Sequence, residues 1–198
     1  MDTKPPHLDP EVAMVVGNAL RESARQATPE QLRDRIDAPL GNMIDAALAG
    51  TGSDEGTVWA ADRDLEEPAL VPIYHFRPGK DTKEFLEKVS QPLGDGLISM
   101  VFASGNSLCE NDIANDPAHS KIVDTTTGRK TRAMIVTPIY ASSVVIAVLT
   151  GVRIAPENTG EQSSGDAYSS KDLATLQSAA RIIGEVFELR YLARLCDW

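Results

Sequence analysis

Residues 92–105 read PLGDGLISMVFASG, and this stretch carries the clearest signal of the architecture. A glycine-rich turn precedes a short apolar helix at residues 97–103, and Ser104-Gly105 matches the glycine that ends many helices. Short apolar runs typical of strands lie on both sides of this helix. They occupy residues 57–61, 69–76 and 85–91 before it, and residues 131–140 and 143–153 after it. We therefore expect a sheet whose strands come from both sides of a central helix.

Two helical patterns precede the first strand. The pair Asp9-Pro10 predicts a helix start, and this helix should end near residue 27. Thr28 and Gln31 have the spacing of a capping box and predict a second helix, which Pro39 should kink. The apolar residues of this second helix recur at helical spacing: Leu32, Ile36, Leu40, Met43 and Ala47.

The last helical pattern begins at Ser169 or Ser170, after an exposed-loop composition at residues 155–165. Its apolar residues follow at spacings of three and four: Leu173, Leu176, Ala180, Ile183 and Phe187. This heptad-like seam suits a helix partner. The whole order predicts an α+β fold with α/β/α sandwich-like layers, in which helices flank a central antiparallel sheet of about five to six strands.

Four segments together resemble the GAF domain, a small-molecule-sensing regulatory fold with a central antiparallel sheet. They are residues 92–105, Asp112 with Asn115-Asp116-Pro117, Thr137-Pro138-Ile139, and Tyr168-Ser169-Ser170-Lys171-Asp172-Leu173. The resemblance covers about residues 32–189 and implies a GAF/PAS-like fold. It divides the chain into an N-terminal dimerisation or linker helix (1–30), a GAF domain (31–190) and the end of the C-terminal helix (191–198).

Residues 116–132, DPAHSKIVDTTTGRKTR, resemble the GAF domains of cyclic-nucleotide phosphodiesterases and some adenylyl cyclases. That subset also carries Asn-Lys after the last central strand, where this chain has Val152-Arg153-Ile154. Its Phe-x3-Asp-Glu motif corresponds here to Tyr168-x3-Asp172-Leu173. In the subset these motifs brace the pocket closed. The resemblance implies a cyclic nucleotide-like pocket, and the replaced motifs predict that cyclic nucleotides bind weakly or not at all.

The same alignment implies ligand contacts at six residues: Thr57, His75, Phe76, Leu97, Ile98 and Thr127. His119, which replaces an aromatic residue of the subset, is a seventh candidate in a polar segment (112–132) that we expect to form a lid over the sheet. Threonine hydroxyls can donate or accept, and helix-start N–H groups favour an anionic group. Loss of the Thr127 hydroxyl should weaken binding by about 1 kcal/mol. The structural alternative is that the apolar candidates are core and that the lid residues form turns.

Composition excludes several classes of partner. The 198 residues include 19 Lys and Arg against 29 Asp and Glu, a net charge of −10, whereas nucleic-acid binding needs clustered cations. The longest strongly apolar run, around residues 144–149, is too short to span a membrane. Two cysteines and the absence of a secretory pattern at the start of the sequence predict a cytoplasmic protein.

The sequence shows no catalytic or metal-ligand pattern. The three histidines, His7, His75 and His119, are scattered, so we expect neither a metal nor a cofactor. GAF domains that reduce free methionine sulfoxide use a cluster of cysteines, and those that hold a bilin attach it to a cysteine commonly followed by histidine. Here Cys109 precedes Glu110 and Cys196 lies near the C-terminus, so we expect no enzyme.

We therefore expect a non-catalytic regulatory or sensory domain that binds a nucleotide-like small molecule or a partner protein. It would signal to a downstream protein through its terminal helices, whose apolar stripes predict a parallel homodimer. The alternative is a dimerisation or protein-interaction scaffold with no ligand. A polar-lined cavity under the lid favours sensing, whereas a cavity filled by Leu, Ile or Phe favours a scaffold.

Overall fold

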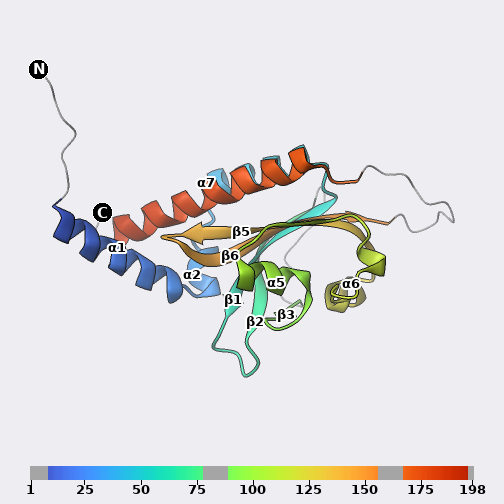
Figure 1. Cartoon of the computed structure of the whole chain (residues 1–198), viewed down its shortest axis with the longest axis horizontal. Coiled ribbons are helices and arrows are strands. Elements are labelled where there is room, and N and C mark those ends of the chain that lie inside the picture. The colour runs from blue at the N-terminus through green and yellow to red at the C-terminus, as the bar shows by residue number, and fades with distance from the viewer. Residues whose placement is uncertain (1–8, 78–88, 156–166, 196–198) are drawn as a thin grey trace, which may run out of the picture.

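The computed structural model describes residues 9–77, 89–155 and 167–195, and within them one antiparallel sheet lies between two layers of helices (Figure 1). Its six described strands run in the order β3-β2-β1-β6-β5-β4. They are β1 (Glu55–Asp62), β2 (Ala69–Phe76), β3 (Gln91–Pro92), β4 (Leu108–Glu110), β5 (Thr131–Ala141) and β6 (Val144–Ile154). The expected α+β fold with an antiparallel sheet is confirmed.

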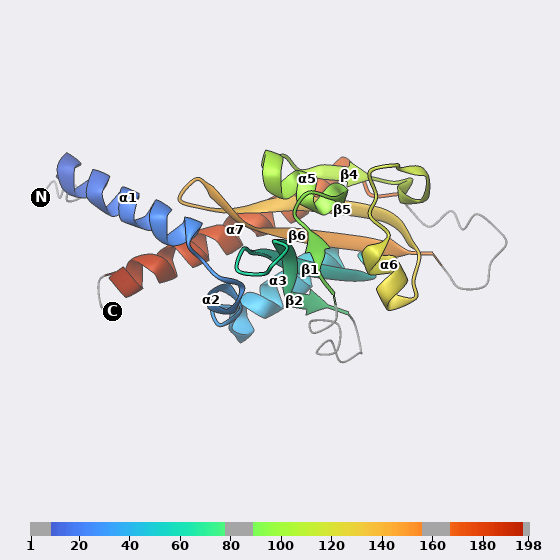
Figure 2. The same ribbon diagram turned by 90° about the horizontal axis from the view of Figure 1, so that it is seen from below.

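The helices divide between the two faces of this sheet. They are α1 (Pro10–Arg25), α2 (Pro29–Arg33), α3 (Ala38–Gly50), α5 (Gly96–Ser104), α6 (Ile122–Thr127) and α7 (Ser170–Leu195), with a 3₁₀ turn at Ile113–Asn115. Residues of α1, α2, α3 and α7 pack on one face, and α5 and α6 cover the other. In Figures 1 and 2, α6 lies at one end of the molecule, and α1 and the C-terminal part of α7 extend at the opposite end.

Local signals position the N-terminal helices, with one correction. Asp9 caps α1, and Thr28 and Gln31 form the expected capping box at α2. The expected single kinked helix after residue 28 is instead two helices, α2 and α3. The Asp37 side chain accepts from the Leu40 amide at 3.1 Å and starts a new helix, with Pro39 in its first turn. There the missing proline N–H costs no hydrogen bond, so the chain breaks before Pro39 rather than bending at it.

The middle of the chain contains the expected helix and three elements that the sequence patterns missed. Gly105 ends α5 with φ +69°, a left-handed conformation that favours glycine. The strand expected at residues 85–91 is observed only as β3 from Gln91, and residues 85–88 lie outside the described part. The segment expected as a polar lid contains the 3₁₀ turn and α6, and β4 precedes it. The loop expected at residues 155–165 also lies outside the described part, except for Ala155.

Each face of the sheet has its own apolar core. Successive residues of a strand point to opposite faces, so Val58 and Ala60 pack toward α3 and α7, while Trp59 and Ala61 pack toward α5. The seam of α7 is buried in the first core: Leu176, Ala180, Ile183 and Phe187 are all at most 1% exposed. The spacing of this seam suggested that it packs on a partner helix. Instead, it packs on the sheet of its own chain. None of the helices in the described residues is long and apolar enough to cross a membrane.

Candidate functional site

A cavity of about 50 Å³ lies between the sheet and the α5–α6 side of the molecule. Its floor is formed by strand residues that include Thr57, Trp59, His75, Met134 and Thr150. Its roof comes from the first turn of α5, from the segment at residues 119–120 and from α6. One water molecule needs about 10–15 Å³ of cavity volume, measured as the space open to the centre of a water-sized sphere. The cavity therefore has room for about four water-sized groups.

The structure brings six of the seven candidate residues to this cavity: Thr57, His75, Leu97, Ile98, His119 and Thr127. Phe76 does not line it and instead packs against the core on the α3 and α7 face. The reason is the alternation of side chains along β2, which directs neighbouring residues to opposite faces. The two candidates His75 and Phe76 could not both face one ligand.

The floor of the cavity holds a network of buried polar groups. Thr57 Oγ1 and His75 Nδ1 are 2.8 Å apart, and Trp59 Nε1 donates to Thr150 Oγ1 at 3.1 Å. Burial, with a smaller contribution from the nearby Arg77 guanidinium, lowers the pKa of His75 from 6.5 to about 4. The imidazole is therefore uncharged at neutral pH, and it presents one donor and one acceptor instead of two donors.

The lid is fastened to the sheet through Asp124 of α6. Its carboxylate accepts from the Thr131 amide at 2.9 Å and from the Thr131 hydroxyl at 2.6 Å, and His119 Nε2 lies 3.4 Å from it. Burial raises the pKa of Asp124, but the hydrogen bonds from His119 and Thr131 outweigh burial and hold the pKa below its usual value. The Thr127 hydroxyl donates to the Val123 carbonyl at 2.8 Å, so only its lone pairs remain for a ligand.

The first turn of α5 is fixed by a close approach at Gly96. Its φ is +80°, and a Cβ there would lie 2.9 Å from both Gln91 Nε2 and Ser120 Cβ. Gln91, only 1% exposed, donates to the Asp95 carbonyl at 2.7 Å. Because the Asp95 side chain makes no capping hydrogen bond, the first N–H groups of α5 lack this partner. Glycine therefore lets the start of α5 form part of the cavity wall.

An open hollow of about 440 Å³ adjoins the cavity and shares lining residues Glu55, Arg129 and Ile154 with it. Glu55 is buried and accepts from Arg77 Nε at 2.8 Å and from Arg129 Nη1 through the same oxygen, Oε1. His75 Nε2 lies 4.0 Å from its other oxygen. This carboxylate therefore joins the start of β1, the end of β2 and the segment after α6.

Several of these residues were not among the candidates from sequence. They include Glu55, Trp59, Gln91, Asp124, Arg129 and Thr150. Alternation along β1 was a usable signal, because Glu55 and Trp59 lie two residues on either side of Thr57 and share its face. Arg129 had no such signal, since it meets Glu55 across 74 residues of sequence.

Three further side chains that the sequence analysis named lie away from the cavity: Arg153, Asp172 and Cys109. Arg153 stacks over the Tyr168 ring at 4.3 Å and donates to the Thr51 carbonyl, and Asp172 accepts from Ser169 at the start of α7. Cys109 packs against the core on the α3 and α7 face, and burial raises its thiol pKa. Thiolate chemistry is disfavoured there.

The described residues contain no group of three or more His, Cys, Asp or Glu side chains arranged to hold a metal.

Comparison with known proteins identifies the family. The family model described as GAF domain matches residues 35–186. The free methionine-R-sulfoxide reductase of Neisseria meningitidis, solved with its substrate, is 18% identical with a TM-score of 0.55, over 95% of this chain and 96% of that one. A GAF domain/HD domain protein of Geobacter sulfurreducens is 11% identical with a TM-score of 0.59, over 84% and 99%. The GAF domain of an Acinetobacter phosphoenolpyruvate-protein phosphotransferase is 13% identical with a TM-score of 0.57, over 90% and 93%. No curated protein sequence matches. The chain belongs to the GAF domain family.

Proposed function

We propose that this chain is a non-catalytic regulatory domain that binds a small molecule in the cavity between the sheet and α6. The observation that carries the proposal is a partly open, mostly apolar cavity that a few polar side chains also line: Thr57, His75 and Thr150 on its floor and Asp124 in its lid. Ligand sites are concave, mostly apolar and supplied with a few placed polar groups. A core built only for stability would fill this space with apolar side chains.

The size of the cavity limits the ligand. Pockets for drug-sized ligands have volumes of about 300–1,000 Å³, well above the roughly 50 Å³ available here. A whole cyclic nucleotide would need the lid to open, and Arg153, which replaces part of the bracing motif, stacks on Tyr168 instead of lining the cavity. These observations support our expectation that cyclic nucleotides bind weakly or not at all.

A non-catalytic role is supported by the chemistry of the cavity. The Neisseria structure is that of a reductase, and at 18% identity the likeness concerns the fold. Among the described residues that line this cavity there is no cysteine, and His75 is a weak base because its pKa is about 4. The buried groups suit recognition better than nucleophilic attack or proton transfer.

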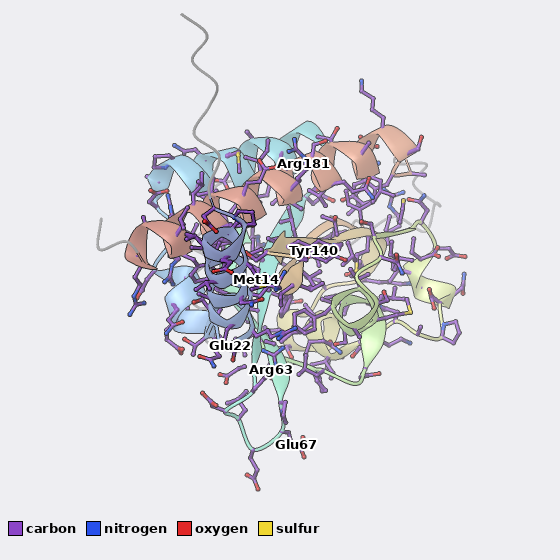
Figure 3. The ribbon with its side chains drawn as sticks, turned by 60° about the vertical axis from the view of Figure 1, so that its left-hand side comes forward. Met14, Glu22, Arg63, Glu67, Tyr140 and Arg181 are labelled. Atoms are coloured by element: carbon purple, nitrogen blue, oxygen red, sulfur yellow. The ribbon has the colours of Figure 1, made fainter. Side chains whose placement is uncertain are left out.

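The signal would leave through the helices at the opposite end from α6, toward a downstream signalling protein. Besides the buried seam, α7 has a second apolar stripe that includes Ile182 and Leu189, which are 39% and 64% exposed. On α1, Val12 and Val15 are also exposed. Figure 3 views the molecule from this end, with the exposed Met14 on α1 in the foreground. Exposed apolar stripes on two neighbouring helices support a parallel homodimer.

Light scattering at tens of micromolar tests the dimer. We expect twice the chain mass for the native protein and the chain mass for Leu189→Glu, because a carboxylate would be buried in the interface. Gln177→Glu is the matched control, since Gln177 is also exposed on α7 and the same negative charge is added about 120° around the helix from Leu189. A monomeric native protein would contradict the dimer without affecting the cavity.

A scaffold without a ligand is the second candidate function, and the small volume of the cavity favours it. Native mass spectrometry of protein purified from its own organism separates the two. We expect a bound small molecule on the native protein and on Ile122→Phe, an exposed position on α6. Val123→Phe fills the cavity from the next residue and should lose the molecule. Protein that is free of any bound molecule in all three forms would favour the scaffold.

We place this protein in the cytoplasm, as its few cysteines suggest.

A further inference from the structure

Three threonine hydroxyls that line the cavity already donate their protons to the protein itself. The donors and their acceptors are Thr127 to the Val123 carbonyl at 2.8 Å, Thr131 to Asp124 Oδ1 at 2.6 Å, and Thr150 to the Thr57 carbonyl at 3.2 Å. A hydroxyl oxygen carries two lone pairs besides its proton. In this arrangement the three hydroxyls can therefore offer a ligand hydrogen-bond acceptors but no donor.

The floor of the cavity holds the two best-defined acceptors, Thr150 and Thr57. Thr150 Oγ1 accepts from Trp59 Nε1 at 3.1 Å, so among the described contacts one of its lone pairs remains. Thr57 Oγ1 lies 2.8 Å from His75 Nδ1 and retains at least one lone pair in either tautomer of the imidazole. Both threonines are buried, at 3% and 4% exposure, and their hydrogen bonds hold the two oxygens in place.

The lid adds further acceptors to the cavity, and the roof adds donors. The carboxylates of Asp124 and Glu55 line the cavity, and an ionised carboxylate accepts hydrogen bonds only. In the roof, the first turn of α5 contributes backbone N–H groups, which the Asp95 side chain does not cap. The cavity thus offers acceptors on its floor and in its lid, and donors at the start of α5.

An uncharged amide group matches both sides of this arrangement. Its NH₂ group donates to acceptors, and its carbonyl oxygen accepts from N–H groups. An ammonium group could satisfy only the acceptors, and a carboxylate could satisfy only the donors. A molecule without N–H groups would leave the buried threonine oxygens without a partner, which lowers its affinity.

We propose that the cavity binds a carboxamide or urea group, with its NH₂ toward Thr57 and Thr150 and its carbonyl toward the first turn of α5. The space accepts about four non-hydrogen atoms, which is the size of urea or acetamide. A larger molecule places its remaining atoms in the adjoining open hollow. This inference rests on the proposed ligand-binding function of the cavity and adds the chemical class of the ligand.

Four probes of equal size separate the number of donors from the size of the ligand. Urea carries two NH₂ groups, acetamide carries one, and acetone and acetate carry none. In a Trp198→Phe background, NMR follows the indole N–H of Trp59, which lines the cavity and donates to Thr150. Each probe is titrated at constant ionic strength up to about 100 mM, well below the molar concentrations at which urea unfolds proteins. We expect urea to bind at least tenfold more tightly than acetone, with acetamide between them and acetate weakest.

Variants of Thr150 test the proposed acceptor. Thr150→Val removes the hydroxyl at nearly constant shape and should weaken urea binding about fivefold without changing acetone binding. Thr150→Ser keeps the hydroxyl and should keep the preference for urea. Thr175→Val, the same exchange at an exposed threonine of α7 that donates to the Lys171 carbonyl, is the matched control and should change neither. If Thr150→Val folds poorly, the ratio of urea to acetone affinity in the native protein still tests the proposal.

Equal binding of urea, acetamide and acetone would overturn the amide class and leave the cavity as a ligand site. Tighter binding of acetate than of acetamide would overturn it in favour of an anion. No response of the Trp59 signal to any probe would also overturn it, since water would then satisfy these acceptors. In each case the native mass measurement would still decide the proposed function separately.

Discussion

The two faces of the sheet are built from the same strands but differ in chemistry. On the α3 and α7 face, Ile44, Ile135 and Phe187 belong to a core in which every one of these side chains is fully buried. On the α5 and α6 face, Trp59 and Met134 share the surface with buried Thr57, His75 and Thr150. The comparison shows that alternation along a strand lets one face supply stability while the other keeps polar groups around a small cavity.

The largest expected effect is on the stability face. Phe187→Ala should lower the free energy of unfolding by about 3–5 kcal/mol, because it leaves a cavity in a close-packed core. Leu189→Ala, two residues further along α7 and 64% exposed, should change it by less than about 0.5 kcal/mol in the monomer. Urea unfolding measures both. A loss below about 1 kcal/mol for Phe187→Ala would show that this face is not the main source of stability.

The polar face should make stability depend on pH through His75. The unfolded chain binds this proton near pH 6.5 and the folded chain only near pH 4, so the unfolded state holds more protons between these values. The free energy of unfolding should therefore fall as the pH is lowered through this window, by about 3 kcal/mol in total. Urea unfolding between pH 7 and 4 measures it, and His75→Gln should flatten the curve. The same slope in both proteins would assign the effect to other groups.

The fastening of the lid gives the next largest effect. Asp124→Ala removes the acceptor of the Thr131 amide and hydroxyl and should lower the free energy of unfolding by about 2 kcal/mol. The half-buried Asp116, whose carboxylate accepts from the nearby Ala118 amide at 2.8 Å, is the control for the lost charge. Thermal unfolding and hydrogen exchange of α6 check the result. Equal losses for Asp124→Ala and Asp116→Ala would mean that α6 is not held through this carboxylate.

The smallest effect is expected at Thr127. Its hydroxyl already donates to the Val123 carbonyl, so Thr127→Ala should weaken ligand binding by less than the 1 kcal/mol expected from the sequence. A titration with the molecule recovered from the native protein measures this. A tenfold loss of affinity would show that the hydroxyl turns toward the ligand when it binds.

Local chemistry explains what the sequence could predict. Asp9, the Thr28–Gln31 pair and Gly105 act on hydrogen bonds within a few residues, and each begins or ends the helix that its pattern indicated. The GAF resemblance extended this to the fold of the domain, and the family match over residues 35–186 agrees with it.

The rest depends on contacts that sequence spacing does not reveal. The break between α2 and α3 required Asp37 to compete as a cap with the continuing helix, and the apolar spacing gave no sign of it. The Glu55–Arg129 pair joins residues 74 positions apart. The prediction that Phe76 contacts a ligand was taken from an alignment, and an alignment does not say which face of a strand each residue occupies.

Hydrogen exchange on two samples of one protein tests the central claim, that the α5 and α6 face holds a ligand while the α3 and α7 face is a stabilising core. One sample is used as purified from its own organism, and the other is unfolded in urea, dialysed and refolded to remove any bound molecule. We predict faster exchange after this treatment in α6 and around Thr57, with no change in the central turns of α3 and α7. Identical exchange of α6 in the two samples, or a change confined to α3 and α7, would contradict the account.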